Sequence, residues 1–186
     1  MAKDIEPYHD NPMTRPRIII HYSGLFDFEG LYALVVDWAK NEQYMWTETD
    51  YKHKVPSPRG AEQEFKWNMF KKVTEYITFE IKMEVHIWNM LDVDVNVNNR
   101  KKTLTSGKVY IWIDSNMGYD WQKRFKGSSF LLFLNNLYHS LIFRQKFENL
   151  YGEQIFYRSH ELQGLIKKFF DMQAKKYAYE DYLKEK

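Results

Sequence analysis

The sequence predicts a single α+β domain, in which a curved antiparallel sheet of about five to six strands packs against helices. Apolar and polar side chains alternate at every second residue through most of the segment 65–113, which is typical of strands with one buried face. Segments with the i, i+3, i+4 spacing of amphipathic helices precede and follow this region. The 186 residues, of which 44% are hydrophobic and 18% aromatic, suffice for one core.

We expect this domain to span residues 16–174. Residues 1–15 are polar and contain Pro7 and Pro12, so they are expected to form an extended N-terminal arm. Residues 175–186 are rich in Lys, Tyr and Glu and are expected to form a polar C-terminal tail.

The beginning of the domain predicts a strand followed by a helix. Residues 17–22 form a short β-branched run, and Ser23-Gly24 is expected to end it. Apolar residues with helical spacing then follow from 28 to 39, and Asp27 is placed to cap the first turn. We expect the helix to end near 41–43.

The middle of the chain predicts long strands. A strand over 44–55 is expected to lead into a proline-rich loop at 56–60. The alternation then runs through Phe65–Val73 and, after a bulged turn within 70–76, from Ile77 to Val97, which is long for one strand. Asn89 stands on the apolar side of the pattern and indicates a bulge or bend.

The next turns are expected at Asn98-Asn99 and at Asp114–Gly118. Asparagine tolerates positive φ, so Asn98-Asn99 is a suitable hairpin tip before a partner strand over 104–113. After the second turn, residues 119–125 are expected to form a short edge strand.

Two helices are expected to close the domain. Ser128 is placed to cap the first, whose apolar stripe consists of Phe130, Phe133, Leu134, Leu137, Tyr138 and Leu141. Gly152 is expected to separate it from the second, whose apolar residues are Ile155, Leu162, Leu165, Ile166 and Phe169.

This order of elements resembles the helix-grip fold of START-type domains. That fold usually has two short helices after its first strand and one long helix at its end, whereas here we expect one helix and a divided end. A closer resemblance, to a family of uncharacterised small archaeal proteins, is carried by the runs at 21–32, 51–54 and 73–76. That resemblance implies no activity.

Composition and motifs exclude several classes of site. The chain has no cysteine, so disulfides and cysteine-based metal or catalytic sites are excluded. It contains no HExxH, GxSxG, GxGxxG or P-loop motif. We therefore favour a non-enzymatic protein without metal or cofactor. The N-terminus lacks the apolar run of a secretory signal and no stretch is long enough to span a membrane, so we expect a cytoplasmic protein.

A polar strand face is the first candidate for chemistry. Glu80, Glu84 and His86 share one face of a predicted strand, and Glu62 and Glu64 of the preceding strand could approach them. Such a set could bind a metal or transfer protons. Cross-strand pairing with Lys66, Lys71 or Lys82 explains these charges equally well, and we favour that interpretation.

Basic residues beside aromatic ones are candidates for nucleic-acid contact. They are Lys52, Lys54, Arg59, Lys123, Arg124 and Lys126. Lysine and arginine can neutralise phosphates, and exposed aromatic rings can stack on bases. The net charge of +2 implies no polyanionic partner by itself, and lysines also protect exposed strands against aggregation.

A surplus of large apolar side chains suggests a ligand cavity between sheet and helices. The candidates are Trp67, Phe79, Met83, Trp112 and Phe133, with Trp88 beside them. The same side chains could equally fill the interior and leave no cavity.

Three functions remain open at the level of the sequence. We favour a non-enzymatic binding or assembly module of unknown partner, which includes a homo-oligomer. This function requires no catalytic motif that the sequence lacks. A small hydrophobic-ligand binder is the second, and a nucleic-acid or ribosome-associated module is the third.

Overall fold

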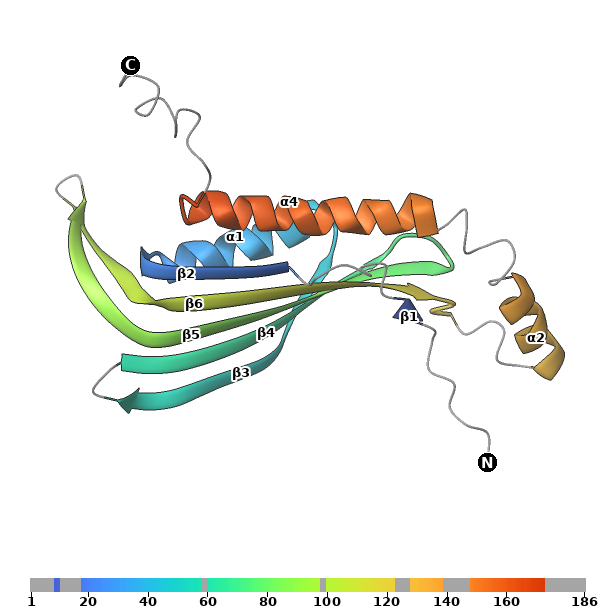
Figure 1. Ribbon diagram of the computed structural model, residues 1–186, viewed down its shortest axis with the longest axis horizontal. Helices are drawn as coiled ribbons and strands as arrows, with labels where there is room; N and C mark the ends of the chain where they lie inside the picture. The colour runs from blue at the N-terminus through green and yellow to red at the C-terminus, as the bar shows by residue number, and fades with distance from the viewer. Residues whose placement is uncertain are drawn as a thin grey trace, which may run out of the picture.

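The computed structural model confirms the predicted α+β class (Figure 1). It describes residues 9–10, 18–57, 60–97, 100–122, 128–138 and 148–172. The strands are β1 (His9–Asp10), β2 (Ile18–Phe26), β3 (Met45–Ser57), β4 (Gly60–Lys72), β5 (Ile77–Val97) and β6 (Arg100–Tyr119). The helices are α1 (Phe28–Asn41), α2 (Ser129–Tyr138), the π-helical turn η2 (Glu148–Gly152) and α4 (Glu153–Phe169).

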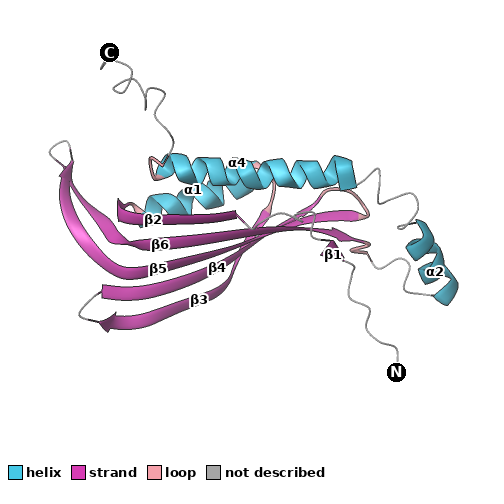
Figure 2. Ribbon diagram, viewed as in Figure 1, coloured by secondary structure: helices cyan, strands magenta, loops and turns pink. Residues whose placement is uncertain are grey.

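The strands form one antiparallel sheet. Its order is β3-β4-β5-β6, and both β2 and the two-residue β1 pair with the free side of β6. The chain therefore leaves β2 at one edge and crosses the sheet through α1 before it enters β3 at the other edge (Figure 2). Among the described residues, β2 and β3 are the long edge strands.

Helices α1 and α4 cover one face of the sheet, which we call the inner face (Figure 1). Asp27 caps α1 as predicted, because its Oδ1 accepts a hydrogen bond from the Gly30 backbone N–H at 3.0 Å. Alternate residues of the strands meet the buried stripes of both helices. The core includes Trp67, Met69, Ile81, Met83, Ile111 and Ile113 from the sheet and Leu31, Val35, Ile155, Leu162 and Ile166 from the helices.

The turn between β4 and β5 is built by a threonine. Thr74 Oγ1 accepts hydrogen bonds from the backbone N–H groups of Tyr76 and Ile77 at 3.2 and 2.9 Å. These side-chain hydrogen bonds add to the backbone bonds from the N–H groups of Val73 and Thr74 to the Ile77 carbonyl, so the turn over 73–76 forms without glycine or proline. Trp121 Nε1 also donates to the Thr74 carbonyl at 3.0 Å and ties this turn to the end of β6.

A crease runs across four strands of the sheet. It consists of Gly24 on β2, Gly107 on β6, the Asn89-Met90 bulge on β5 and Gly60 on β4. Gly24 and Gly107 are register partners, and two residues of β5 oppose Gly107 because the register shifts between Trp88 and Leu91. Beyond the crease the β5–β6 hairpin curves up to the level of the helices (Figure 1). Bulges and glycines are the usual means of bending a sheet.

The bulge that Asn89 indicated is therefore confirmed, and it has a further consequence. Asn89 has φ 54°, and the extra residue exchanges the two faces for the rest of the strand. Leu91 and Val93 consequently lie opposite Ser106 and Leu104 and are exposed on the outer face, away from the helices. Within β5, the prediction that the odd positions build one wall of the core holds only as far as Ile87, whereas Val109, Ile111 and Ile113 of β6 lie in the core as predicted.

Several predicted boundaries are wrong. Strand β3 continues to Ser57 and β4 begins at Gly60, although the sequence predicts a loop over 56–60, and β6 begins at Arg100 instead of 104. Strand β2 continues through Ser23-Gly24 to Phe26, and β6 continues through 114–118 to Tyr119, because both segments remain in register with their neighbours. Gly152 does not interrupt the helical backbone: with φ −63° and ψ −40° it joins η2 directly to α4.

Some expected features lie outside the described residues. These are most of the N-terminal arm, the tail after 174, and the tip at Asn98-Asn99, although Val97 and Arg100 pair on either side of that tip. The predicted edge strand after 119 is replaced by a turn over 121–122, and residues 123–125 are not described.

Candidate functional site

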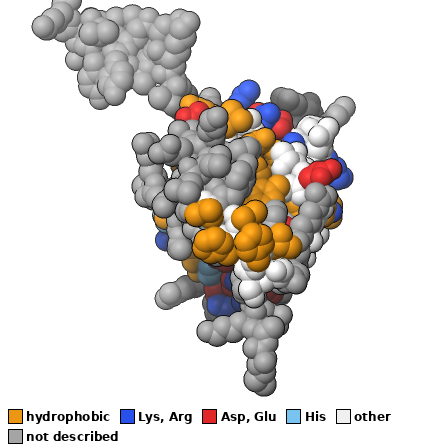
Figure 3. Space-filling view, turned by 90° about the vertical axis from the view of Figure 1, so that its right-hand side faces the viewer, with side chains coloured by type: hydrophobic (Ala, Val, Ile, Leu, Met, Phe, Trp, Pro, Cys, Tyr) orange, Lys and Arg blue, Asp and Glu red, His pale blue; other side chains and the backbone are white. Residues whose placement is uncertain are grey.

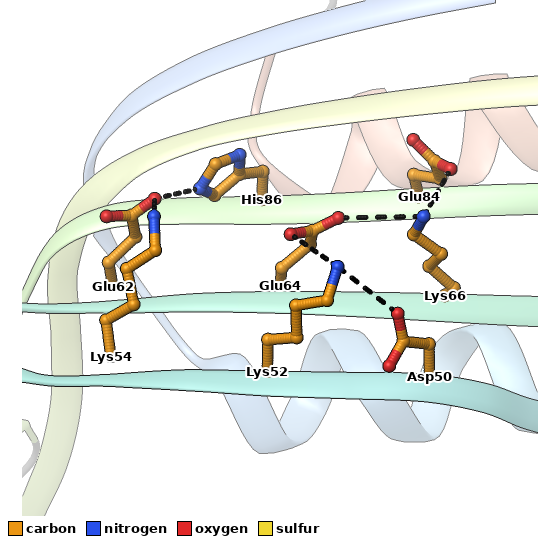
Figure 4. Close-up of polar contacts among 8 residues, drawn as sticks. All are labelled: Asp50, Lys52, Lys54, Glu62, Glu64, Lys66, Glu84 and His86. Atoms are coloured by element: carbon orange, nitrogen blue, oxygen red, sulfur yellow. Dashed lines mark hydrogen bonds and ion pairs between the residues drawn. The ribbon is translucent and has the colours of Figure 1, made fainter.

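The face of the sheet opposite the helices, which we call the outer face, carries a lattice of ion pairs over β3, β4 and β5 (Figure 4). The residues belong to neighbouring strands in register. Lys54 is opposite Glu62, and Lys52 is opposite Glu64. On the next pair of strands, Lys66 is opposite Glu84. Opposite charges therefore alternate across the strands, an arrangement that stabilises a sheet face.

Glu62 is the most heavily contacted carboxylate of this lattice. Its Oε1 accepts a hydrogen bond from Lys54 Nζ at 2.7 Å and lies 2.7 Å from His86 Nε2. The hydrogen bond from Lys54, followed by that from His86, lowers the pKa of Glu62. In the next row, hydrogen bonding to Asp50 raises the pKa of Lys52, with Glu64 adding to the effect.

The structure thus brings together part of the predicted polar set. Glu62 reaches His86, whereas Glu84 and Glu64 share Lys66 at 3.4 and 3.8 Å. Glu80 pairs with Lys82 at 3.4 Å and accepts from Asn68 Nδ2. Lys71 instead donates to the Glu42 carbonyl at 2.8 Å.

A His–carboxylate pair can move protons in principle. The structure favours a structural role for this one, because Glu62 also binds Lys54 and the pair belongs to a charge-balanced lattice. Among the described residues, no group of three or more Asp, Glu or His side chains is arranged to hold a metal ion.

Beside the lattice, towards β2, the outer face becomes aromatic. His86 stacks on Trp88 with ring centroids 3.8 Å apart. Tyr110 lies between Trp88, at 6.4 Å, and His21, at 4.9 Å. These rings come from three neighbouring strands because His21, Tyr110 and His86 occupy one transverse row of the register.

A depression of about 320 Å³ opens beside these rings. It is lined by His21, Tyr22, Ser23, Trp88, Lys108 and Val109. Ser23, Lys108 and Trp88 form the next transverse row, immediately before the crease. The volume is at the lower end of the range for small-molecule sites.

Lys108 differs from the lysines of the ion-pair lattice. Lys52, Lys54, Lys66 and Lys82 each lie within 4 Å of a carboxylate. Within the described part of the chain, no carboxylate pairs with Lys108, whose side chain is exposed at the rim of the depression. The depression therefore combines one uncompensated cation with an indole ring, an imidazole and a hydroxyl.

The predicted cavity residues come together only in part, with Trp67 and Met83 opposite each other on β4 and β5. Trp67, Phe79 and Met83 are buried on the inner face, where they pack in the core. Trp112 alternates with the buried Ile111 and Ile113 and so lies on the outer face. Phe133 is 61% exposed on α2.

Helix α2 carries a further apolar surface. It lies beyond the end of the sheet (Figure 1), and its exposed side chains are Phe130, Leu131, Phe133, Leu134 and Leu137. Figure 3, which views the molecule from this end, shows hydrophobic side chains gathered at the surface. Ser128 Oγ accepts from the Phe130 backbone N–H at 3.3 Å, as expected of the predicted cap.

The predicted nucleic-acid residues are divided. Lys52 and Lys54 lie side by side on β3, but carboxylates on β3 and β4 compensate their charges. Arg59, Lys123, Arg124 and Lys126 lie outside the described residues.

The sequence patterns do not predict that His21, Trp88 and Lys108 lie close together. Trp88 was expected to face the helices, although its even-numbered position already placed it with Glu84 and His86 on the polar face. Its neighbours could not be found in this way, because they come from strands far apart in the chain and depend on the register.

Comparison with protein-family models, with curated proteins and with solved structures found no match for this chain. None of the helices in the described ranges combines the length and the apolar character that a membrane span requires.

Proposed function

We propose that this chain is a non-catalytic binding module whose outer-face depression takes a small planar aromatic molecule that carries a carboxylate or phosphate group. The observation that carries this proposal is the uncompensated Lys108 beside the Trp88 ring, on a face where neighbouring lysines are paired with carboxylates.

The two halves of such a ligand match different groups. The Trp88 indole stacks on His86, with ring centroids 3.8 Å apart, and Trp88 also lines the depression, where a ligand ring can contact it. Stacking on an aromatic side chain is worth about 1–3 kcal/mol per base. The ammonium of Lys108 and the Ser23 hydroxyl supply donors for an anionic group, which forms stronger hydrogen bonds than a neutral one.

A long polyanion is less well matched to this face. Binding of nucleic acid along a strand requires several free cations, and Lys52 and Lys54 are already neutralised by Asp50, Glu62 and Glu64. The geometry therefore favours a single small anion over a nucleic-acid chain.

The direct test is a titration with three probes: AMP, which has a ring and a phosphate, adenosine, which has only the ring, and inorganic phosphate, which has only the charge. We expect AMP to bind more tightly than either fragment. Lys108→Gln and Trp88→Leu should each weaken AMP binding about tenfold, because each removes an interaction of about 1.4 kcal/mol or more.

Lys82→Gln is the matched control, because Lys82 is an exposed lysine of the same face that is paired with Glu80. It should leave AMP binding unchanged. Equal effects of Lys108→Gln and Lys82→Gln would contradict the proposal. So would binding of a short single-stranded oligonucleotide much tighter than that of AMP, with a steep dependence on salt.

A further inference from the structure

The two long edges of the sheet are chemically different. Strand β3 carries Glu48, Asp50, Lys52 and Lys54, and its register shifts twice. Charged side chains and bulges are features that prevent an edge strand from pairing with another chain. Strand β2 has the sequence IIIHYSGLF, without an acidic residue, a lysine, an arginine or a proline.

The β2 edge is also regular and exposed. Its nine residues pair with β6 in an unbroken register from Ile18 to Phe26, so it is about 30 Å long at roughly 3.3 Å per residue. In an antiparallel strand, alternate residues direct their backbone N–H and C=O groups away from the neighbour. Within the described residues, β6 is the only strand that pairs with β2, so no other strand of that part of the chain occupies these outward groups. The Leu25 carbonyl also accepts a hydrogen bond from the Tyr22 hydroxyl at 2.9 Å.

We infer that the β2 edge pairs with the β2 edge of a second copy of this chain, antiparallel and about a two-fold axis through Tyr22. This inference does not depend on the ligand proposed above. In such a pair, a residue of β2 that directs its backbone groups outward must lie opposite another residue that does so. These residues alternate along the strand, so the residue numbers of each opposing pair must add up to an even number. If residues 18–26 of the two copies overlap completely, the numbers of opposing residues add up to 44, so Ile18 lies opposite Phe26 and Tyr22 opposite Tyr22.

This register is self-complementary. On the outer face, Ile19 of each copy lies opposite Leu25 of the other, and these side chains are 45% and 47% exposed in the single chain. Two apolar cross-strand pairs therefore form, and no like charges are brought together because β2 carries none. A closed two-fold pair also satisfies both edges without growing into a fibre.

The pairing extends the wall of the outer-face depression. His21 and Ser23 both line it, and in the inferred register His21 of one copy lies opposite Ser23 of the second copy. The two depressions consequently lie side by side across the two-fold axis.

The test is the oligomeric state of the full chain, measured by light scattering after gel filtration and by sedimentation over a range of concentrations. We expect a reversible dimer. Ile19→Lys with Leu25→Lys places lysine opposite lysine twice and should raise the dimer dissociation constant at least about tenfold, because like charges directly opposite destabilise a strand pair.

Ile19→Lys with Leu25→Glu uses the same positions but places lysine opposite glutamate twice, and it should restore the dimer. Because both replaced side chains are exposed, the circular dichroism and melting temperature of a single chain should change little. Met45→Lys, at a residue that is 65% exposed on the opposite edge, should have no effect.

A second comparison separates β2 from the apolar helix. Phe130→Lys with Phe133→Lys replaces exposed side chains of α2 and should leave the dimer intact. A wild-type chain that stays monomeric up to about 1 mM, a dimer that survives the double-lysine change in β2, or a dimer that only the α2 change dissociates would each overturn the inference.

Discussion

Glu62 shows how a single side chain is shared between two neighbouring strands. The same oxygen atom lies 2.7 Å from Lys54 Nζ of β3 and 2.7 Å from His86 Nε2 of β5. Both contacts favour the ionised carboxylate, which is why the pKa of Glu62 is lowered. A protonated Glu62 would lose this favourable interaction with both partners.

This arrangement predicts an acid-dependent contribution to stability. Because the pKa of Glu62 is lower in the folded chain than its usual value of 4.5, ionised Glu62 stabilises the fold above pH 4.5. That contribution is lost as the pH falls through the lowered pKa. Glu62→Gln should therefore reduce the free energy of unfolding at neutral pH, by a small amount, and the difference from the wild type should shrink in acid. Urea unfolding between pH 2 and pH 7 measures it.

The control for this prediction is the same change in a Lys54→Gln chain, from which the main cause of the pKa shift has been removed. There the pH dependence of the Glu62→Gln effect should be smaller. A difference between the wild type and Glu62→Gln that stays constant from pH 7 to pH 2 would contradict this account of Glu62.

At the scale of elements, the crease decides where the sheet bends and which residues reach the core. Gly60 is central to it. With φ +109° it has a backbone conformation that other residues rarely adopt, and an added Cβ would lie 2.7 Å from the Asn89 carbonyl carbon and 2.9 Å from the Met90 carbonyl oxygen. Strands β4 and β5 approach each other this closely only because residue 60 has no side chain.

Gly60→Ala should consequently destabilise the protein by about 1–3 kcal/mol or more, since backbone strain and a clash with backbone atoms add together. Gly164→Ala is the matched control. An added Cβ at Gly164, in α4, meets no atom within 4 Å, so alanine there should stabilise the helix by about 0.5–1 kcal/mol. Chemical denaturation of both variants measures the two effects. Equal stability of Gly60→Ala and the wild type would be incompatible with the crease.

Much of this element level could be predicted from sequence, because it follows from local patterns. The helix over 28–41, its cap at Asp27, the long alternating strands and the bulge at Asn89 all have local signals. The ends of β2 and β6 were misplaced because Ser23-Gly24 and Asp114–Gly118 look like turns. Their pairing with neighbouring strands overrides that local preference.

At the scale of the whole molecule, the two faces of the sheet serve different purposes. The inner face packs on α1 and α4 and contributes most of the buried core. The outer face carries the ion-pair lattice over β3–β5 and the aromatic depression over β5, β6 and β2. The two long edges of the sheet also differ in charge and regularity: β3 is charged and bulged, whereas β2 is uncharged and regular.

The polar half of the outer face could be foreseen, because two-residue alternation assigns Glu80, Glu84 and His86 to one side of a strand. The depression could not. His21, Trp88 and Lys108 belong to three strands, and only the register, together with the bulge after Trp88, places them beside one another. Similarly, the absence of a carboxylate partner for Lys108 among the described residues depends on cross-strand neighbours that no local pattern specifies.

Residue-resolved NMR of the labelled full-length chain during an AMP titration tests the central claim most directly. We expect the indole N–H of Trp88 and the amides of residues 21–23 and 108–109 to shift together and to saturate by about 1 mM AMP. Shifts concentrated at inner-face residues such as Trp67 and Met83, or no shift at that concentration, would contradict it.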